Sequence, residues 1–200
     1  MTELVFILDR SGSMAGLVSD TIGRFNSMIE KQKKEAGEAL VTTVLFDNES
    51  VTVHDRLPLE KVLPLTEKEY SPRGCTALLD AVGGTIRHIA NIHRYVRRED
   101  VPERTLFVIT TDGYENASRY YDYDKVRRMI EHEKTKYGWE FLFLGANIDA
   151  DRAVDYKCDA EGTALNYEAI GEAVCAARSE RTLGTAWRRR IDEDVKKRGR

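Results

Sequence analysis

The chain has 200 residues, which is enough for one α/β domain with a buried core and some chain left over. Apolar residues make up 42% of it and charged residues 32%, and the formal net charge of -3 excludes an overall bias towards nucleic acid or membrane surfaces. No apolar run approaches the ~20 residues that a membrane-spanning helix needs.

The cysteines bear on the compartment. Cys75, Cys158 and Cys175 are an odd number without a CxxC pair, which argues against a disulfide framework or a zinc site and favours a reducing cytoplasm. The first apolar run begins almost at once, without a basic segment or the apolar core of a signal peptide before it. We therefore expect a cytoplasmic protein.

The first predicted element is a strand over residues 4–8, where five consecutive apolar residues indicate burial on both faces. It runs into Asp9, Ser11 and Ser13, so that hard oxygen ligands follow its carboxyl end, where open α/β sheets place their ligands. Mg²⁺ and Mn²⁺ prefer such ligands. The simpler alternative is that these side chains turn the chain and cap the next helix.

Apolar residues at helical spacing predict a helix over residues 17–35, which Gly37 ends. Strands over 39–46 and 50–57 follow, and the turn between them is short enough to make them an antiparallel hairpin. A second helix is predicted over 77–96.

The second half begins with a strand over residues 105–111, and a helix containing Val126 ends before Gly138. A strand over 139–144, a short sixth strand over 153–158 and a helix over 167–178 with Asn166 as its cap complete the set. Only eight residues separate 144 from 153, fewer than a parallel crossover needs, so we expect no full-length helix there and a shortened sheet edge. The alternative is that 149–156 form that helix and the sixth strand is absent or displaced.

Two further motifs complete a pattern with Asp9-x-Ser11-x-Ser13. Thr76 lies in a Gly-rich loop, Arg73-Gly74-Cys75-Thr76, and Asp112 ends a β-rich run before Gly113. The three motifs lie within residues 1–145 and resemble, in the same order, the metal-ion-dependent adhesion site of von Willebrand factor A-type (vWA) domains. The chain looks like the small stand-alone vWA proteins of bacteria and their phages.

This resemblance implies a Rossmann-like, doubly wound α/β fold: a mostly parallel central sheet with one antiparallel edge strand and helices on both faces. It assigns residues 1–177 to the domain. It also implies a Mg²⁺ site, with Mn²⁺ as an alternative ion. Ser11, Ser13 and Thr76 would supply hydroxyl oxygens, and Asp9 and Asp112 would bind directly or through water.

By the same resemblance, the ion would accept an Asp or Glu side chain from a partner protein, which makes the chain a binding module without catalysis. The runner-up is a Mg²⁺-dependent hydrolase of phosphate esters, against which the sequence offers no general base beside the hydroxyls. Arg10, Arg73 and Glu115 are expected around the metal face, either in contact with a partner or as solvated loop charges. Tyrosines 114, 120 and 121 are either interface anchors or packed on their own loop.

The last 23 residues differ in charge. Residues 178–200 contain nine Lys or Arg and four Asp or Glu, a net charge of +5, so the preceding 177 residues carry -8. A flexible solvated tail is one interpretation, and a tether to nucleic acid or to an acidic protein surface is the other.

If the second interpretation holds, nucleic-acid binding resides in this segment and weakens steeply with salt. Deletion of residues 183–200 is then expected to abolish binding of DNA and RNA, measured by fluorescence anisotropy over a series of salt concentrations, and to leave the metal site intact. Binding that survives the deletion would contradict this assignment.

Overall fold

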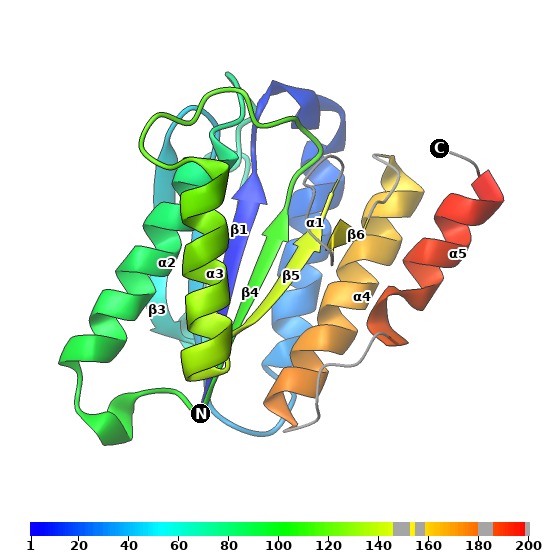
Figure 1. Ribbon diagram of the computed structural model, residues 1–200. Helices are drawn as coiled ribbons and strands as arrows, with labels where there is room; N and C mark the ends of the chain where they lie inside the picture. The colour runs from blue at the N-terminus through cyan, green and yellow to red at the C-terminus, as the bar shows by residue number, and fades with distance from the viewer. Residues whose placement is uncertain (146–152, 155–158, 180–185, 199–200) are drawn as a thin grey trace.

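The computed structural model describes residues 1–145, 153–154, 159–179 and 186–198, and its centre is one six-stranded sheet with the order β3-β2-β1-β4-β5-β6 (Figure 1). The strands are β1 Thr2–Asp9, β2 Ala39–Phe46, β3 Ser50–Pro58, β4 Arg104–Thr110, β5 Glu140–Leu144 and β6 Ala153–Val154. Only β3 runs antiparallel to its neighbour. The predicted fold class, with its single antiparallel edge strand, is confirmed.

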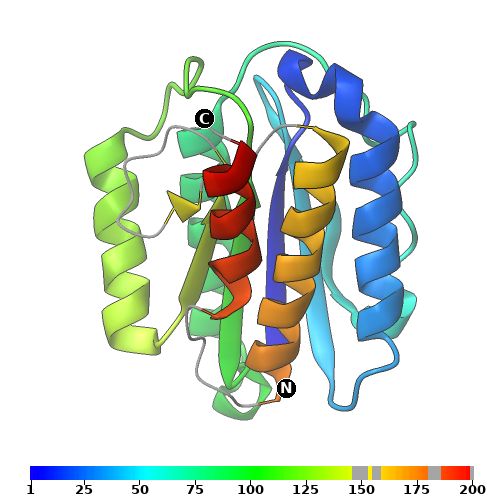
Figure 2. The same ribbon diagram turned by 90° about the vertical axis from the view of Figure 1, so that its right-hand side faces the viewer.

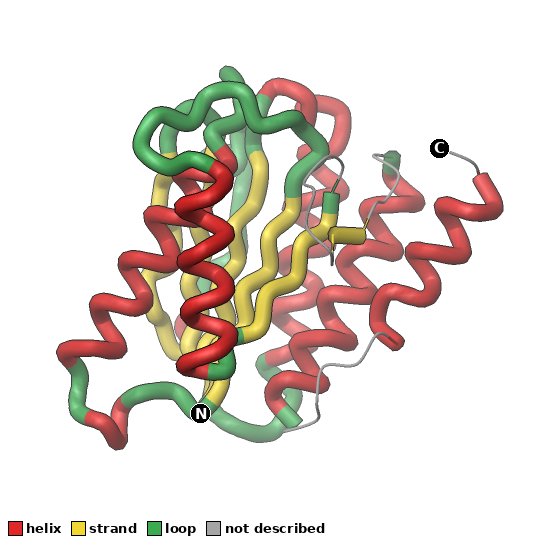
Figure 3. Tube along the Cα trace, in the orientation of Figure 1, coloured by secondary structure: helices red, strands yellow, loops and turns green. Residues whose placement is uncertain are grey.

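Two helical layers enclose the sheet. The α-helices are α1 Val18–Gln32, α2 Leu78–Tyr95, α3 Tyr123–Tyr137, α4 Ala160–Arg178 and α5 Arg189–Arg198, and short 3-10 helices cover Gly12–Leu17, Leu59–Lys61, Arg98–Asp100 and Ala186–Arg188. Helices α2 and α3 cover one face, and α1 and α4 cover the other, where α5 lies beside α4 on the side away from α1 (Figure 2). Figure 3 shows the same layers by type of secondary structure.

Successive side chains of β1 point to opposite faces of the sheet, and both faces are covered by helices, which explains why its apolar run is continuous. Leu4, Phe6 and Leu8 belong to the core beneath α1 and α4, whereas Val5 and Ile7 belong to the core beneath α2 and α3. Every residue of β1 is buried. The registers place Leu8 beside Leu45 of β2 and Thr110 of β4, so the loops that follow β1 and β4 leave the sheet at the same edge.

Helix α4 begins earlier than expected. Its N-cap is Asp159, whose carboxylate accepts a hydrogen bond from the Gly162 N–H at 2.7 Å, whereas the predicted cap, Asn166, lies buried inside the helix. The first turns are rich in small residues, so they show little apolar periodicity. At the other end of α4, the Arg178 guanidinium donates to the carbonyl oxygens of Gln32 and Gly37 and closes the end of α1.

The sixth strand exists but is two residues long. Ala153 and Val154 pair in parallel with Phe143 and Leu144 of β5. The alternative in which this strand is absent is therefore wrong, and the sheet edge is short, as expected. The connection over 146–152 lies outside the described residues, so the expected lack of a crossover helix stays a prediction.

The segment for which a flexible tail was one interpretation is helical over Arg189–Arg198, the bounds of α5. Deletion of residues 183–200 would therefore remove a packed helix as well as the basic charge. Ile191 is 1% exposed and joins the core under α4, with Trp187 and Val195 packed beside it. Ion pairs from Arg190 to Glu168 and from Arg198 to Asp159 also join α5 to α4. Trp187, Ile191 and Val195 form a narrow apolar stripe with i, i+4 spacing. The many charged residues around them made this stripe difficult to recognise in the sequence. In the described ranges, no helix is both long and apolar enough to cross a membrane.

If α5 is part of the folded unit, Ile191→Ala should lower the free energy of unfolding by about 2–5 kcal/mol, the usual cost of truncating a buried isoleucine. The matched control Glu193→Ala, at an exposed position of the same helix, should change it by less than about 0.5 kcal/mol. Chemical denaturation measures both. Equal stability of the two variants would show that α5 does not contribute to the fold.

Candidate metal centre

Asp9 is the last residue of β1 and is 1% exposed. One of its carboxylate oxygens accepts a hydrogen bond from the Ser11 N–H, and the other accepts one from the Thr111 hydroxyl, each at 2.6 Å. Thr111 follows β4, the strand next to β1. The two bonds fix the carboxylate at the edge where the two central strands end.

Hydroxyl groups extend this arrangement across the edge. The Ser11 and Ser13 Oγ atoms lie 3.0 Å apart, and Ser13 Oγ donates to Asp112 Oδ1 at 2.6 Å. Residues from the loops after β1 and after β4 thus form one hydrogen-bonded chain from Asp9 to Asp112.

Thr76 approaches the same point from the third loop. A Cβ atom on Gly113 would lie 2.6 Å from Thr76 Oγ1, so only glycine lets this hydroxyl lie so close to the backbone beside Asp112. The Thr76 N–H donates to the Asn116 side chain at 3.0 Å, and the Asn116 N–H donates to the Thr76 carbonyl at 3.1 Å. All five predicted site residues therefore lie at one edge of the sheet.

The donor set fits a hard divalent cation. It offers two carboxylates and three hydroxyls, the oxygen ligands that Mg²⁺ and Mn²⁺ take while they retain water. Among the residues that the structure describes, His, Cys, Asp and Glu side chains form no group of three or more that could hold a metal ion. An ion at this edge would thus depend on hydroxyl oxygens as well as on the two carboxylates.

The protonation of Asp9 reflects the same surroundings. Burial raises the pKa of the Asp9 carboxyl, hydrogen bonds from Thr111 and Ser11 oppose this shift, and the negative charge of Asp112 adds to it. Two carboxylates that are brought together in this way are stabilised by a positive charge between them.

Asp47 holds the loops in place and was not singled out from the sequence. Its side chain is 4% exposed, and its Oδ2 lies 3.0 Å from Arg10 Nε and 2.9 Å from Arg73 Nε. Its carbonyl oxygen accepts from the Ala77 N–H at 2.8 Å. The turn after β2 thereby joins the loop after Asp9 to the loop that carries Thr76. Its only sequence signal was an ordinary Asp-Asn-Glu turn.

Arg10 is buried and Arg73 is exposed, and both pair with Asp47, so neither is simply a solvated charge. Glu115 has a structural role, because its carboxylate accepts from the backbone N–H groups of Leu79 in α2 and Ser118 in its own loop. In the opposite direction, the Asp80 carboxylate of α2 accepts hydrogen bonds from three consecutive backbone N–H groups of the loop, those of residues 119–121.

These bonds hold the loop over residues 113–122 against α2. A Cβ atom on Gly83 of α2 would clash with the Tyr121 ring, which shows that Tyr121 packs on its own domain. Tyr114 and Tyr120 are 68% and 78% exposed. The loop therefore presents two of the three tyrosines to solvent.

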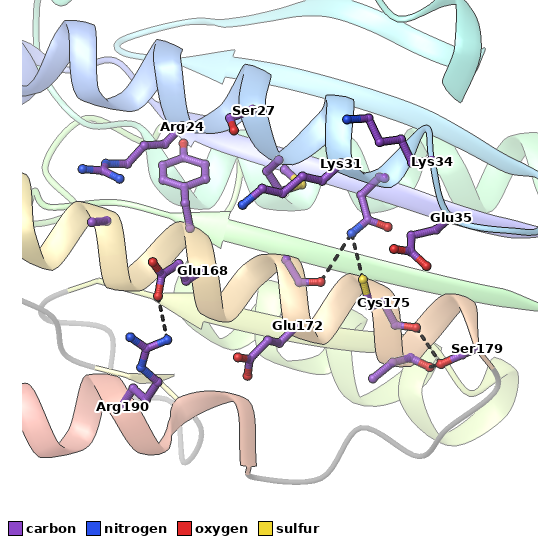
Figure 4. A pocket seen from close by; sticks show the side chains of 16 residues that line it. Arg24, Ser27, Lys31, Lys34, Glu35, Glu168, Glu172, Cys175, Ser179 and Arg190 are labelled. Atoms are coloured by element: carbon purple, nitrogen blue, oxygen red, sulfur yellow. Dashed lines mark hydrogen bonds and ion pairs between the residues drawn. The ribbon is translucent and has the colours of Figure 1, made fainter.

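A large groove lies elsewhere, between α1 and α4, with a volume of about 980 Å³ (Figure 4). Basic side chains from α1 face acidic ones from α4 across it, and Arg190 pairs with Glu168 at one end. None of the five predicted ligands lines it. The candidate metal centre is thus separate from this groove.

The fold can be compared with solved structures. A mutant of the PilB minor pilin from Streptococcus sanguinis matches with a TM-score of 0.55 at 13% identity, covering 87% of this chain and 61% of that one. A von Willebrand factor type A structure from Catenulispora acidiphila matches with a TM-score of 0.55 at 11% identity, covering 88% of this chain and 43% of that one. This chain thus spans less than two thirds of either. At such identities the likeness shows the fold, which is that of vWA domains.

Comparison of the sequence with protein-family models and with curated proteins gave no match.

Asp47→Asn should destabilise the fold by about 3–5 kcal/mol at neutral pH, because it leaves the buried Arg10 without its counter-charge. Although burial alone would raise the pKa of Asp47, the Glu49 N–H and the two arginines hold it below its usual value. A depressed pKa stabilises the fold above the unfolded value of about 3.9 and ceases to do so as the pH falls through the folded value. The difference between variant and wild type should therefore shrink below about pH 4.

Urea denaturation at several pH values measures this difference, with Glu67→Gln at an exposed position as the control. A loss of stability that is independent of pH would show that the charge of Asp47 is not what holds the loops.

Proposed function

We propose that this chain is a protein-binding module in which a divalent cation, Mg²⁺ or Mn²⁺, accepts an acidic side chain from a partner protein. The observation that carries the proposal is the hydrogen-bonded chain from Asp9 through Ser11 and Ser13 to Asp112, with Thr76 beside it. The vWA fold supports it, because domains of this fold are mostly interaction modules rather than enzymes.

The charge of the site explains why a partner would be captured. Two carboxylates neutralise a divalent ion only in part, because the Asp9 carboxylate also accepts hydrogen bonds from Ser11 and Thr111 and the three hydroxyls contribute no charge. An ion held there would act as a Lewis acid towards one more anionic oxygen. An Asp or Glu of a partner supplies such an oxygen.

The surroundings suit protein binding. Because Glu115 and Asp80 hold the loop over 113–122, the exposed Tyr114 and Tyr120 are presented with little further ordering to be done on binding. Tyrosine is enriched among residues that dominate the energy of interfaces. A reducing cytoplasm remains the compartment that we propose, because the cysteines are odd in number and form no CxxC pair.

Calorimetric titration of Mg²⁺ and Mn²⁺ tests the site. The wild type should bind the ion, and Asp9→Ala and Thr76→Ala should each lower its affinity about tenfold or more, because an octahedral hard-ion site has few protein ligands to lose. Both variants should still fold, since their side chains lie at the edge of the sheet. Ser71→Ala, an exposed hydroxyl near the Thr76 loop, should bind like the wild type.

The capping interpretation gives the opposite pattern: the wild type binds no metal, and Asp9→Ala costs only the ~0.5–2 kcal/mol of a lost cap. Each titration is repeated with acetate as a stand-in for the partner's carboxylate, because the ion's shell can require it. A lack of metal binding in both conditions would refute the proposal. Metal-dependent release of phosphate from p-nitrophenyl phosphate would instead favour a hydrolase.

A further inference from the structure

A second cavity, of about 210 Å³, lies at the opposite end of the sheet from Asp9. It is enclosed by the last turns of α2, the link into β4, the last turns of α3 and the start of β5, which meet in the lower part of Figure 1 near the N-terminus. Its polar and aromatic lining includes His93, Arg94, His132, Glu133, Lys136 and Trp139.

Glu133 is the unusual member of this lining. The residue is 7% exposed, and its Oε2 atom is fully buried without a hydrogen-bond partner among the described residues. Native proteins rarely bury a polar atom in this way, because its lost hydration is then uncompensated.

Glu3 is a second buried carboxyl group of this protein, and its surroundings differ from those of Glu133. Glu3 is fully buried, and its two carboxylate oxygens contact Arg56 Nε at 2.6 Å and His93 Nε2 at 2.5 Å. His93 also lines the cavity. Two buried carboxyl groups therefore lie near one imidazole, and only one of them has its oxygens satisfied. Because Glu133 lines the cavity, its carboxylate is a group that a hydrogen-bond donor or a positive charge in the cavity would stabilise.

The other groups restrict the chemistry of that ligand. Arg94 and Lys136 also line the cavity, so a ligand with only a positive charge would meet two cations. A ligand with only a negative charge would meet Glu133 and Glu103, which lines the cavity as well. Trp139 also lines the cavity, with its ring held by stacking on Phe107 at a centroid distance of 5.3 Å, so part of the lining is aromatic. A zwitterion with a small apolar or flat side chain meets all three conditions.

We propose that this cavity binds a free α-amino acid. Its ammonium group pairs with the Glu133 carboxylate, its carboxylate pairs with Arg94 or Lys136, and its side chain lies against Trp139. The volume agrees, because 210 Å³ is below the ~300–1,000 Å³ typical of pockets for drug-sized molecules. The site is independent of the proposed metal centre, which lies at the other end of the sheet.

Isothermal titration of each of the twenty common amino acids into the full chain, with EDTA present, tests the proposal. At least one should bind the wild type, and Glu133→Gln should weaken it at least tenfold, because the ammonium loses its counter-charge. The matched control is Glu131→Gln, two residues away on the same helix, where the carboxylate is exposed and pairs with Lys134. This variant should bind like the wild type.

Derivatives of the bound amino acid test the zwitterion requirement on the wild-type protein, so the result does not depend on how well a variant folds. The N-acetyl derivative and the carboxamide should each bind at least tenfold more weakly. Binding of the N-acetyl derivative at full affinity would overturn the proposal. So would full affinity in a folded Glu133→Gln variant, or no binding of any amino acid, which would mean that water alone fills the cavity.

Discussion

The burial of β1 on both faces is the constraint from which the rest of the structure follows. Its alternate residues enter two separate cores, one under α1 and α4 and one under α2 and α3. Each fully buried aliphatic or aromatic side chain contributes about 1.5–3 kcal/mol. The apolar run therefore continues to Leu8, and the first candidate ligand is Asp9, the last residue of β1. Because β4 pairs with β1 in parallel and in full register, Thr111 and Asp112 reach the same edge.

The parts of the fold that follow from such runs could be predicted from the sequence. The apolar stretches over 4–8 and 105–111 identified the two central strands, and the short turn at Asp47 identified the antiparallel hairpin. The five candidate ligands lie together because each follows a strand or precedes a helix at one edge, which the order of motifs already indicated. Helix α4 begins six residues before Asn166, because its first turns consist of small residues that carry no periodic signal.

Long-range polar contacts could not be predicted in the same way. Asp47 joins Arg10 and Arg73 across 37 and 26 positions of sequence, and Asp80 accepts from backbone groups about 40 residues away. Any acidic residue in a turn or in the first turn of a helix has the same local pattern. Only the folded backbone decides which of them become buried anchors. Helix α5 is a further case, because one apolar stripe in a segment, residues 178–200, with nine basic residues gives little periodic signal.

The buried acidic residues of this protein fall into two groups, those that stabilise the fold and those that are candidates for binding. Asp47 and Glu3 are each matched by arginine or histidine contacts, so they serve the fold. Asp9 accepts two hydrogen bonds yet lies in one hydrogen-bonded chain with a second carboxylate. Glu133 has a buried oxygen to which none of the described residues donates. An anionic or acidic group that the fold itself leaves incompletely compensated is stabilised most by binding a cation or a hydrogen-bond donor. The two ends of the sheet present this condition in different forms: hard oxygens at the carboxyl end would suit a metal ion, and a carboxyl in a partly aromatic cavity at the amino end would suit an organic ammonium group.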